Sequence, residues 1–269
     1  MNSNKTKLTY SSEGDKKIKR IIIRSIEKLS GQPKLEQMYN EVLALNPSSE
    51  EIWKILIDRL DLKLDFEQLA FDAIPQKEPL IFIANHPFGV VDGIVFGHMV
   101  KQKRKDFKFL VNSVLCREKV LNRYFLPIDF ATTKEAIQTN IKTRKDALRC
   151  IENGESIVIF PSGGVATSKR PFKKAEELDW KKFILKLIRQ SKASVVPFYF
   201  YGQNSPLFQF ISQVSMDLRI SMLLNEVRNK VGKTIKLAIG KPITFSEMQA
   251  YKGDELLDFL YNQVHQLAK

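Results

Sequence analysis

The sequence predicts a single α/β domain with a central mixed, largely parallel β-sheet flanked by helices and preceded by an N-terminal helical region. The chain has 269 residues, 43% hydrophobic and 10% aromatic, which is enough for one substantial core. From residue 79 onward, short apolar runs alternate with charged amphipathic segments, as in sheets whose strands are joined by helices. Residues 15–70 are instead rich in helix formers, so we expect a helical region over residues 1–70 and one domain over residues 71–269.

The N-terminal region is predicted to hold three helices. The first has an apolar face among basic residues, formed by Ile18, Ile22, Ile26 and Leu29. This helix could dock on the domain or lie on a membrane surface, because both need one apolar stripe. A second helix is expected from about residue 33 to residue 45, ending at Asn46 and Pro47, and a third from Ser49.

Five apolar runs are the candidate strands of the sheet. Each is short and bounded by polar or turn-forming residues, as buried strands are. They cover residues 79–84, 107–111, 156–160, 194–201 and 235–239. Because amphipathic segments of helical length separate them, we expect the strands to pair mostly in parallel.

The charge of the chain predicts an anionic partner. Lysine and arginine total 43 against 30 acidic residues, so the formal net charge is +13. Nucleic acid, anionic lipid and an acidic carrier protein all fit this charge. We find no zinc-knuckle spacing, no aromatic RNA-binding motif and no long basic run, so a nucleic-acid partner is not expected.

Other patterns bear on the compartment and exclude several enzyme classes. Cys116 and Cys150 show no CxxC spacing, so we expect no disulfide framework, no metal and a reducing compartment. The polar N-terminus lacks the apolar core of a signal peptide, and the uncharged stretch 193–216 is interrupted too often to span a membrane. We therefore expect a cytoplasmic protein lying on the inner face of the cell membrane. GxSxG, P-loop and HExxH motifs are absent from the sequence, so we do not expect a serine hydrolase, a nucleotide-triphosphate enzyme or a zinc protease.

A histidine and an aspartate follow the first candidate strand. His86 comes directly after the apolar run, and Asp92 follows it after a proline and a glycine. Active sites of open α/β sheets often lie where a strand ends in a loop. A neutral imidazole can accept a proton at pH 7, and a carboxylate bonded to its other nitrogen fixes the tautomer and stabilises the imidazolium. No serine completes a triad, so the nucleophile could be the hydroxyl of an acceptor molecule.

This block resembles a known family. Asn-His-Pro-x-Gly-x-x-Asp-Gly, formed by Asn85, His86, Gly89, Asp92 and Gly93, is similar to the first motif of the lysophosphatidic acid and glycerol-3-phosphate acyltransferases, in their bacterial hemolysin-like or lyso-ornithine-lipid branch. Further segments resemble the family in the same order: residues 125–129, 160–166, 196–200, 202–205 and 240–242. The similarity extends over roughly residues 25–245, and the joint order of the motifs carries it.

The resemblance implies a glycerol-3-phosphate acyltransferase-like fold and transfer of a fatty acyl group from acyl carrier protein or acyl-CoA to a lysolipid hydroxyl. It implies no cofactor beyond that co-substrate. His86 would be the general base, oriented by Asp92. Five residues separate the pair where the family commonly has four, so the loop must bulge, and Gly89 could supply that freedom. Ser162 stands where the family usually has a glutamate that holds glycerol phosphate, which favours an amino-acid-headed lysolipid, with a lysophospholipid still open.

Several residues are candidates for substrate binding. They are Asn85, Gly89, Gly93, Arg117, Arg123, Ser162, Gly163, Gly164, Lys169, Arg170, Gln203 and Asn204. The glycines after Ser162 would let backbone amides approach an oxyanion, although a plain turn explains them equally well. Lys169 and Arg170 could bind a phosphate or carboxylate or be solvated surface charges. Arg117 and Arg123 are alternatives for one acceptor-binding arginine, and Gln203 and Asn204 could belong to a turn before a helix N-cap.

Two other functions remain open on the sequence alone. A non-catalytic lipid-binding protein of the same fold would keep an apolar site without using His86. A basic nucleic-acid-binding protein would explain the charge, although the motifs for it are missing.

Overall fold

The computed structural model describes residues 32–48, 50–113, 116, 121–170, 173–214 and 216–269. The predicted amphipathic helix at residues 18–29 lies outside this part of the chain. The other two predicted N-terminal helices are α2 (Gln32–Ala44) and α3 (Ile52–Arg59). The division of the chain at residue 70 stays a prediction.

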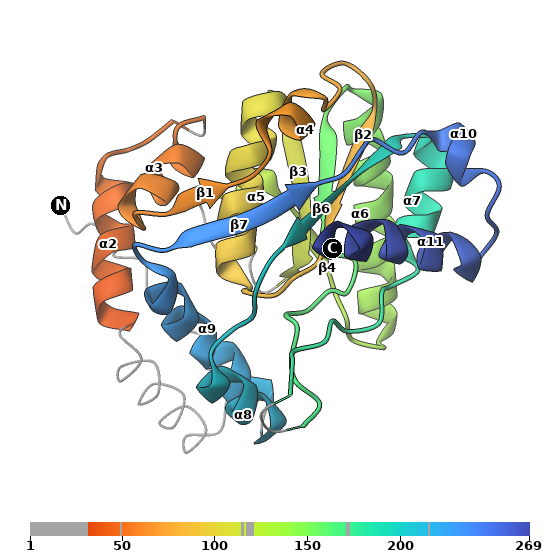
Figure 1. Ribbon diagram of the computed structural model, residues 1–269. Helices are drawn as coiled ribbons and strands as arrows, with labels where there is room; N and C mark the ends of the chain where they lie inside the picture. The colour runs from red at the N-terminus through yellow and green to blue at the C-terminus, as the bar shows by residue number, and fades with distance from the viewer. Residues whose placement is uncertain (1–31, 49, 114–115, 117–120, 171–172, 215) are drawn as a thin grey trace.

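One seven-stranded sheet forms the centre of the fold (Figure 1). Its order is β1-β7-β6-β2-β5-β3-β4. Among the described strands only β6 and β7 pair antiparallel, so the predicted mixed, largely parallel sheet is confirmed. The strands are β1 (Lys63–Asp65), β2 (Leu80–Ala84), β3 (Phe107–Asn112), β4 (Phe125–Ile128), β5 (Ser156–Ile159), β6 (Ser194–Phe200) and β7 (Thr234–Ile239).

The two strands that the sequence pattern did not predict are the sheet edges. β1 has three residues and little burial, so it lacks an apolar run. β4 contains Pro127, which cannot donate to a ladder and is tolerated at an edge strand. Edge strands are short and partly solvated, which weakens the hydrophobic signal on which sequence prediction depends.

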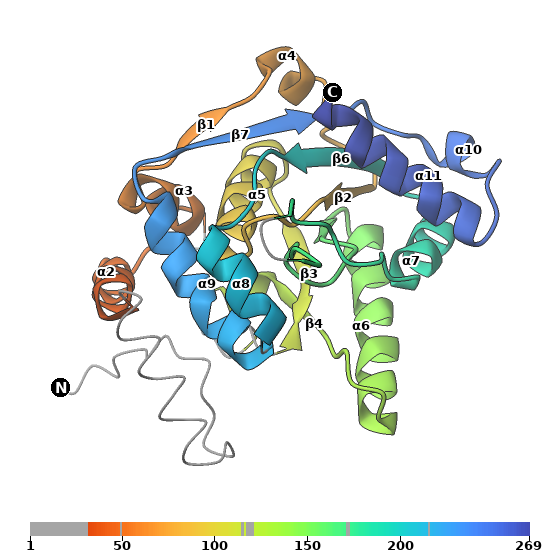
Figure 2. The same cartoon turned by 60° about the horizontal axis from the view of Figure 1, so that its bottom comes forward.

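Helices cover both faces of the sheet (Figure 2). Alternate residues of β2 divide between two cores: Leu80, Phe82 and Ala84 face one, and Ile81 and Ile83 face the other. The first core also contains α2, α3, α5 (Val90–Lys103) and α9 (Met216–Lys230). The second contains α6 (Lys134–Glu152), α7 (Phe183–Ser191) and α11 (Asp254–His265). The remaining helices are α4 (Gln68–Asp72), η2 (Asn122–Tyr124), α8 (Pro206–Val214), α10 (Phe245–Met248) and η3 (Gln266–Ala268).

The parallel register brings several loops to one edge. β2, β5 and β6 lie side by side in parallel, with Ile83 opposite Ile159 and Ala84 opposite Phe198. The segments that follow these strands therefore start close together at their carboxyl ends. Among the described helices, none combines the length and apolar character needed to span a bilayer.

α3 packs on α5 at Gly97, and we expect a side chain at this position to lower the stability of the fold. A β-carbon there would lie 2.4 Å from ring atoms of Trp53. That indole cannot retreat easily, because it is 2% exposed and touches Phe107, Phe109 and Tyr124. We expect Gly97→Ala to destabilise the fold by ~1–3 kcal/mol through overpacking, measured by thermal or urea unfolding.

Gly93 in the same helix is the matched control. A β-carbon at Gly93 meets nothing within 4 Å. Gly93→Ala should leave stability unchanged or raise it by up to ~1 kcal/mol, because alanine is the better helix former. Equal effects of the two substitutions would contradict the packing argument.

Candidate active site

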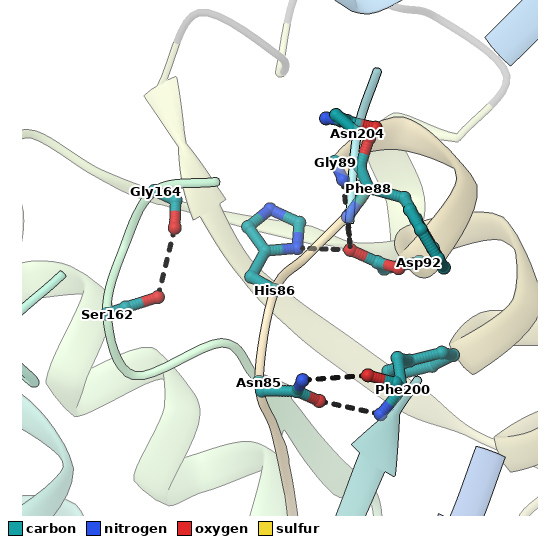
Figure 3. A network of polar contacts seen from close by, with 9 residues as sticks. All are labelled: Asn85, His86, Phe88, Gly89, Asp92, Ser162, Gly164, Phe200 and Asn204. Atoms are coloured by element: carbon teal, nitrogen blue, oxygen red, sulfur yellow. Dashed lines mark hydrogen bonds and ion pairs between the residues drawn. The ribbon is translucent and has the colours of Figure 1, made fainter. Parts of the chain in front are cut away.

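The site begins at Asn85, the residue that follows β2. This side chain is buried and bridges to the end of β6: its amide nitrogen donates to Phe200 O at 2.9 Å, and Phe200 N donates to its amide oxygen at 2.7 Å (Figure 3). The two bonds continue the pairing of β2 with β6 beyond the last strand residue. They fix the backbone from which His86 projects.

His86 and Asp92 meet as the sequence analysis expected. His86 Nδ1 lies 3.0 Å from Asp92 Oδ2. The same oxygen accepts hydrogen bonds from the backbone N–H of Phe88 at 2.7 Å and of Gly89 at 2.9 Å. Asp92 is fully buried in the first turn of α5, so these three contacts lie away from solvent. A carboxylate can only accept, so Nδ1 carries its hydrogen and a neutral ring leaves Nε2 free to take a proton.

Gly89 provides the bulge that the spacing demanded. Its φ is +85°, in the region that favours glycine. A β-carbon would also lie 2.9 Å from Leu223 and 3.1 Å from Val165. Only glycine therefore lets the loop turn back so that Asp92 reaches the imidazole.

A second loop, residues 160–166, passes beside the histidine; we call it the glycine loop. The Phe160 ring stacks on the His86 ring with centroids 4.0 Å apart, and Ala166 N donates to His86 O at 2.8 Å. Ser162 is buried, and its hydroxyl donates to Gly164 O at 3.1 Å, which closes the turn. Ser162 thus shapes the loop.

The two glycines of this loop are required by their surroundings. A β-carbon at Gly163, where φ is +69°, would lie 2.6 Å from Phe130, and one at Gly164 would lie 2.8 Å from Leu178. Within the described part of the chain, the N–H groups of Gly164 and Val165 donate to no acceptor. Free backbone N–H groups are suited to binding an oxyanion.

Comparison with known proteins decides the family. The model of the acyltransferase family matches residues 67–268, which is more than half of the chain. The chain belongs to the acyltransferase family. This confirms the resemblance drawn from the motifs and the prediction that the protein is an enzyme of acyl transfer.

Two curated relatives align with most of the chain. The lyso-glycine lipid O-acyltransferase of Bacteroides thetaiotaomicron is 27% identical over 249 residues, covering 88% of this chain and 86% of that protein. The protein of the same name from Phocaeicola vulgatus is 26% identical over 256 residues, covering 91% and 86%. Among solved structures, the 1-acyl-sn-glycerophosphate acyltransferase PlsC of Thermotoga maritima is similar with a TM-score of 0.51 and 15% identity, covering 92% of this chain and 95% of that one. That likeness confirms the predicted fold.

Gln203 and Asn204, which follow β6, connect segments around the candidate site. Asn204 is buried, and its amide nitrogen is 3.5 Å from Phe88 O. Gln203 accepts a hydrogen bond from Ala175 N at 2.9 Å. The next residue, Ser205, accepts from Phe208 N at 3.2 Å and so caps α8, as the alternative interpretation of this segment expected. A direct role of the amides in substrate binding stays a prediction.

The basic residues predicted to bind substrate are exposed on the surface wherever the structure describes them. Lys169 is exposed and pairs with Glu176 at 2.6 Å, and Arg170 beside it is also exposed. Arg123 is exposed and places its guanidinium 5.2 Å from the centre of the Tyr124 ring. Arg117 lies outside the described residues. Gly93 lies in the first turn of α5, where a β-carbon would meet nothing within 4 Å.

One buried carboxylate near the glycine loop belongs to no sequence motif. The Glu177 side chain is 3% exposed and lies 3.4 Å from Nε2 of His265, a residue that the motifs left unassigned. No local pattern distinguishes Glu177 from its exposed neighbour Glu176, so only the folded chain could identify it.

Proposed function

We propose that this acyltransferase moves a fatty acyl group from the thioester of acyl carrier protein or coenzyme A to the hydroxyl of a lysolipid, with His86 as general base oriented by Asp92. The observation that carries the proposal is the 3.0 Å contact between Nδ1 and the buried carboxylate, which leaves Nε2 as the free base.

The acceptor hydroxyl, the thioester and His86 account for every bond and proton of the reaction. The acceptor oxygen attacks the thioester carbonyl while its proton passes to His86 Nε2. The carbonyl oxygen becomes an oxyanion, for which the free N–H groups of Gly164 and Val165 are candidate donors. When the C–S bond breaks, the thiolate takes the proton from Nε2, and the products are an ester and a free thiol. Asp92 stabilises the imidazolium between the two steps.

The acceptor is proposed to carry an amino-acid head group. The two relatives that cover most of the chain are named for a lyso-glycine lipid. Ser162 is uncharged and stands where the family usually has a glutamate, so this position adds no negative charge that would repel a carboxylate head group. Lys169 and Arg170 follow this loop and are the candidate cations for that head group.

A membrane surface is the proposed source of the acceptor. The net charge of +13 favours anionic lipid and also an acidic acyl carrier protein. Phe130 and Leu178, which pack on the two glycines of the glycine loop, keep 43% and 36% of their surface exposed. Exposed apolar side chains packed on the glycine loop suit a substrate with long acyl chains.

The test uses purified protein with two donors and two acceptors. Acyl carrier thioester and acyl-CoA are each offered with lyso-glycine lipid and with lysophosphatidic acid. We expect release of free thiol together with an O-acylated product, detected by mass spectrometry, with faster turnover of lyso-glycine lipid. No product from any of the four combinations would support the non-catalytic lipid-binding alternative.

A further inference from the structure

Glu177 is directed inward by the strand-like segment that carries it. Residues 173–180, which we call the strap, run past the glycine loop, and Thr167 and Glu176 form an antiparallel bridge with both N···O distances 3.0 Å. Side chains alternate along extended backbone. Glu176 therefore points to solvent, where it pairs with Lys169, and Glu177 points to the interior with 3% of its side chain exposed.

The surroundings of Glu177 disfavour a negative charge. Neither carboxylate oxygen has a hydrogen bond of normal geometry within the described residues, and the nearby Trp180 indole N–H is also unpartnered. Burial raises the pKa of Glu177 to about 7, the charge of Asp92 adds to this rise, and Trp180, Ser162 and the His86 backbone N–H oppose it. A second buried anion beside Asp92 would be costly, so the neutral acid is the stable form below that pH.

His265 supplies the partner for that proton. Its Nδ1 lies 2.9 Å from Tyr261 O, and since a carbonyl only accepts, Nδ1 must carry a hydrogen. Nε2 of the neutral ring then carries no hydrogen and lies 3.4 Å from Glu177 Oε2. An ion pair would fit this distance, but burial lowers the pKa of His265 while it raises the pKa of Glu177. Both shifts favour a neutral acid that donates to a neutral imidazole.

The strap is attached directly to the glycine loop. Leu178 packs on Gly164, and Lys181 N, just after the strap, donates to Pro161 O at 2.9 Å. Other titratable or charged groups also surround the pair: Asp92 of α5, Tyr199 of β6, Tyr261 of α11, and Lys169, Lys174 and Glu176 from the strap side. An ionised Glu177 has no proton to donate to His265 Nε2, so the strap, and with it the glycine loop, would lose this contact with α11.

We propose that Glu177 is a positioning residue that acts as a neutral carboxylic acid: it shares one proton with His265 and thereby holds the glycine loop in the geometry needed for acyl transfer. This rests on the proposed function, in which that loop binds the oxyanion. The active form of Glu177 is the protonated one, so its contribution to turnover is fully present below about pH 7 and is lost as the pH rises through about 7.

Glu177→Gln is the discriminating variant. The glutamine amide donates to His265 Nε2 at any pH, and its oxygen can accept from Trp180, so the variant imitates the protonated acid permanently. In the wild type we expect kcat to fall about tenfold per pH unit above about 7, with little change in KM. The variant should keep its kcat there and exceed the wild type about tenfold at about pH 8. Asp258→Asn, which removes an exposed carboxylate of α11, should follow the wild-type profile.

Infrared spectroscopy measures the protonation state of Glu177 without requiring turnover. The wild type should show a buried carboxylic-acid carbonyl band at about pH 6 that disappears by about pH 8, and Glu177→Gln should lack it. Absence of this band in the wild type would overturn the proposal even if the glutamine variant failed to fold. The same alkaline loss of kcat in wild type and Glu177→Gln would also overturn it. A wild type without acyl transfer would refute the proposed function and this positioning role together, whereas the band would still show whether Glu177 is neutral.

Discussion

Replacing His86 by alanine is expected to lower the rate of acyl transfer by about 10² to 10⁴, the usual cost of losing a general base. Without the imidazole, the acceptor hydroxyl has no group to take its proton during attack on the thioester. Release of free thiol under single-turnover conditions measures the effect. Acceptor binding should change little, so the loss should fall on kcat.

A second histidine serves as the control. His98 lies in the same chain on α5, outside the glycine loop, and burial lowers its pKa. His98→Gln should leave the rate unchanged. If His86→Ala kept the wild-type rate with intact folding, the proton must be taken by another group and the proposed mechanism would be wrong.

The central strands were predictable because a strand buried on both faces appears in the sequence as a continuous apolar run. All five residues of β2 are buried, and its apolar run stands out from the charged segments around it. β1, with three mostly exposed residues, has no such run. Its place in the sheet is set by pairing with β7, a contact distant in sequence.

The site residues also fall into two groups, those that one short segment predicts and those that only the folded chain brings together. His86 and Asp92 were predictable because a spacing in one short segment carries both, and a single glycine explains how they meet. Glu177 and His265 are 88 residues apart along the chain, and only the packing of α11 beside the strap brings them together. Burial of a carboxylate depends on such packing, and Glu177 has the same local sequence context as the exposed Glu176.

Replacing Asp92 by asparagine is expected to cost about 10² to 10⁴ in kcat. The amide can hold the ring through its oxygen but does not carry the charge that stabilises the imidazolium. It also introduces a mismatch: Oδ2 accepts three hydrogen bonds, and Oδ1 is buried with no partner among the described residues. An amide nitrogen at either position leaves a buried donor unsatisfied, which should lower the free energy of unfolding by ~1–3 kcal/mol.

A double-mutant cycle separates these two effects. If Asp92 acts on catalysis through His86, then His86→Ala combined with Asp92→Asn should be no slower than His86→Ala alone, because residues that act as one unit are not additive. The stability loss from the buried amide should remain in the double variant, measured by unfolding at the same pH. Rate losses that multiply would mean that the carboxylate works independently of the imidazole. The 3.0 Å contact, with Asp92 held by two backbone N–H groups as well, favours the non-additive outcome, because fixing this ring is the one task the geometry gives that oxygen beyond closing the loop.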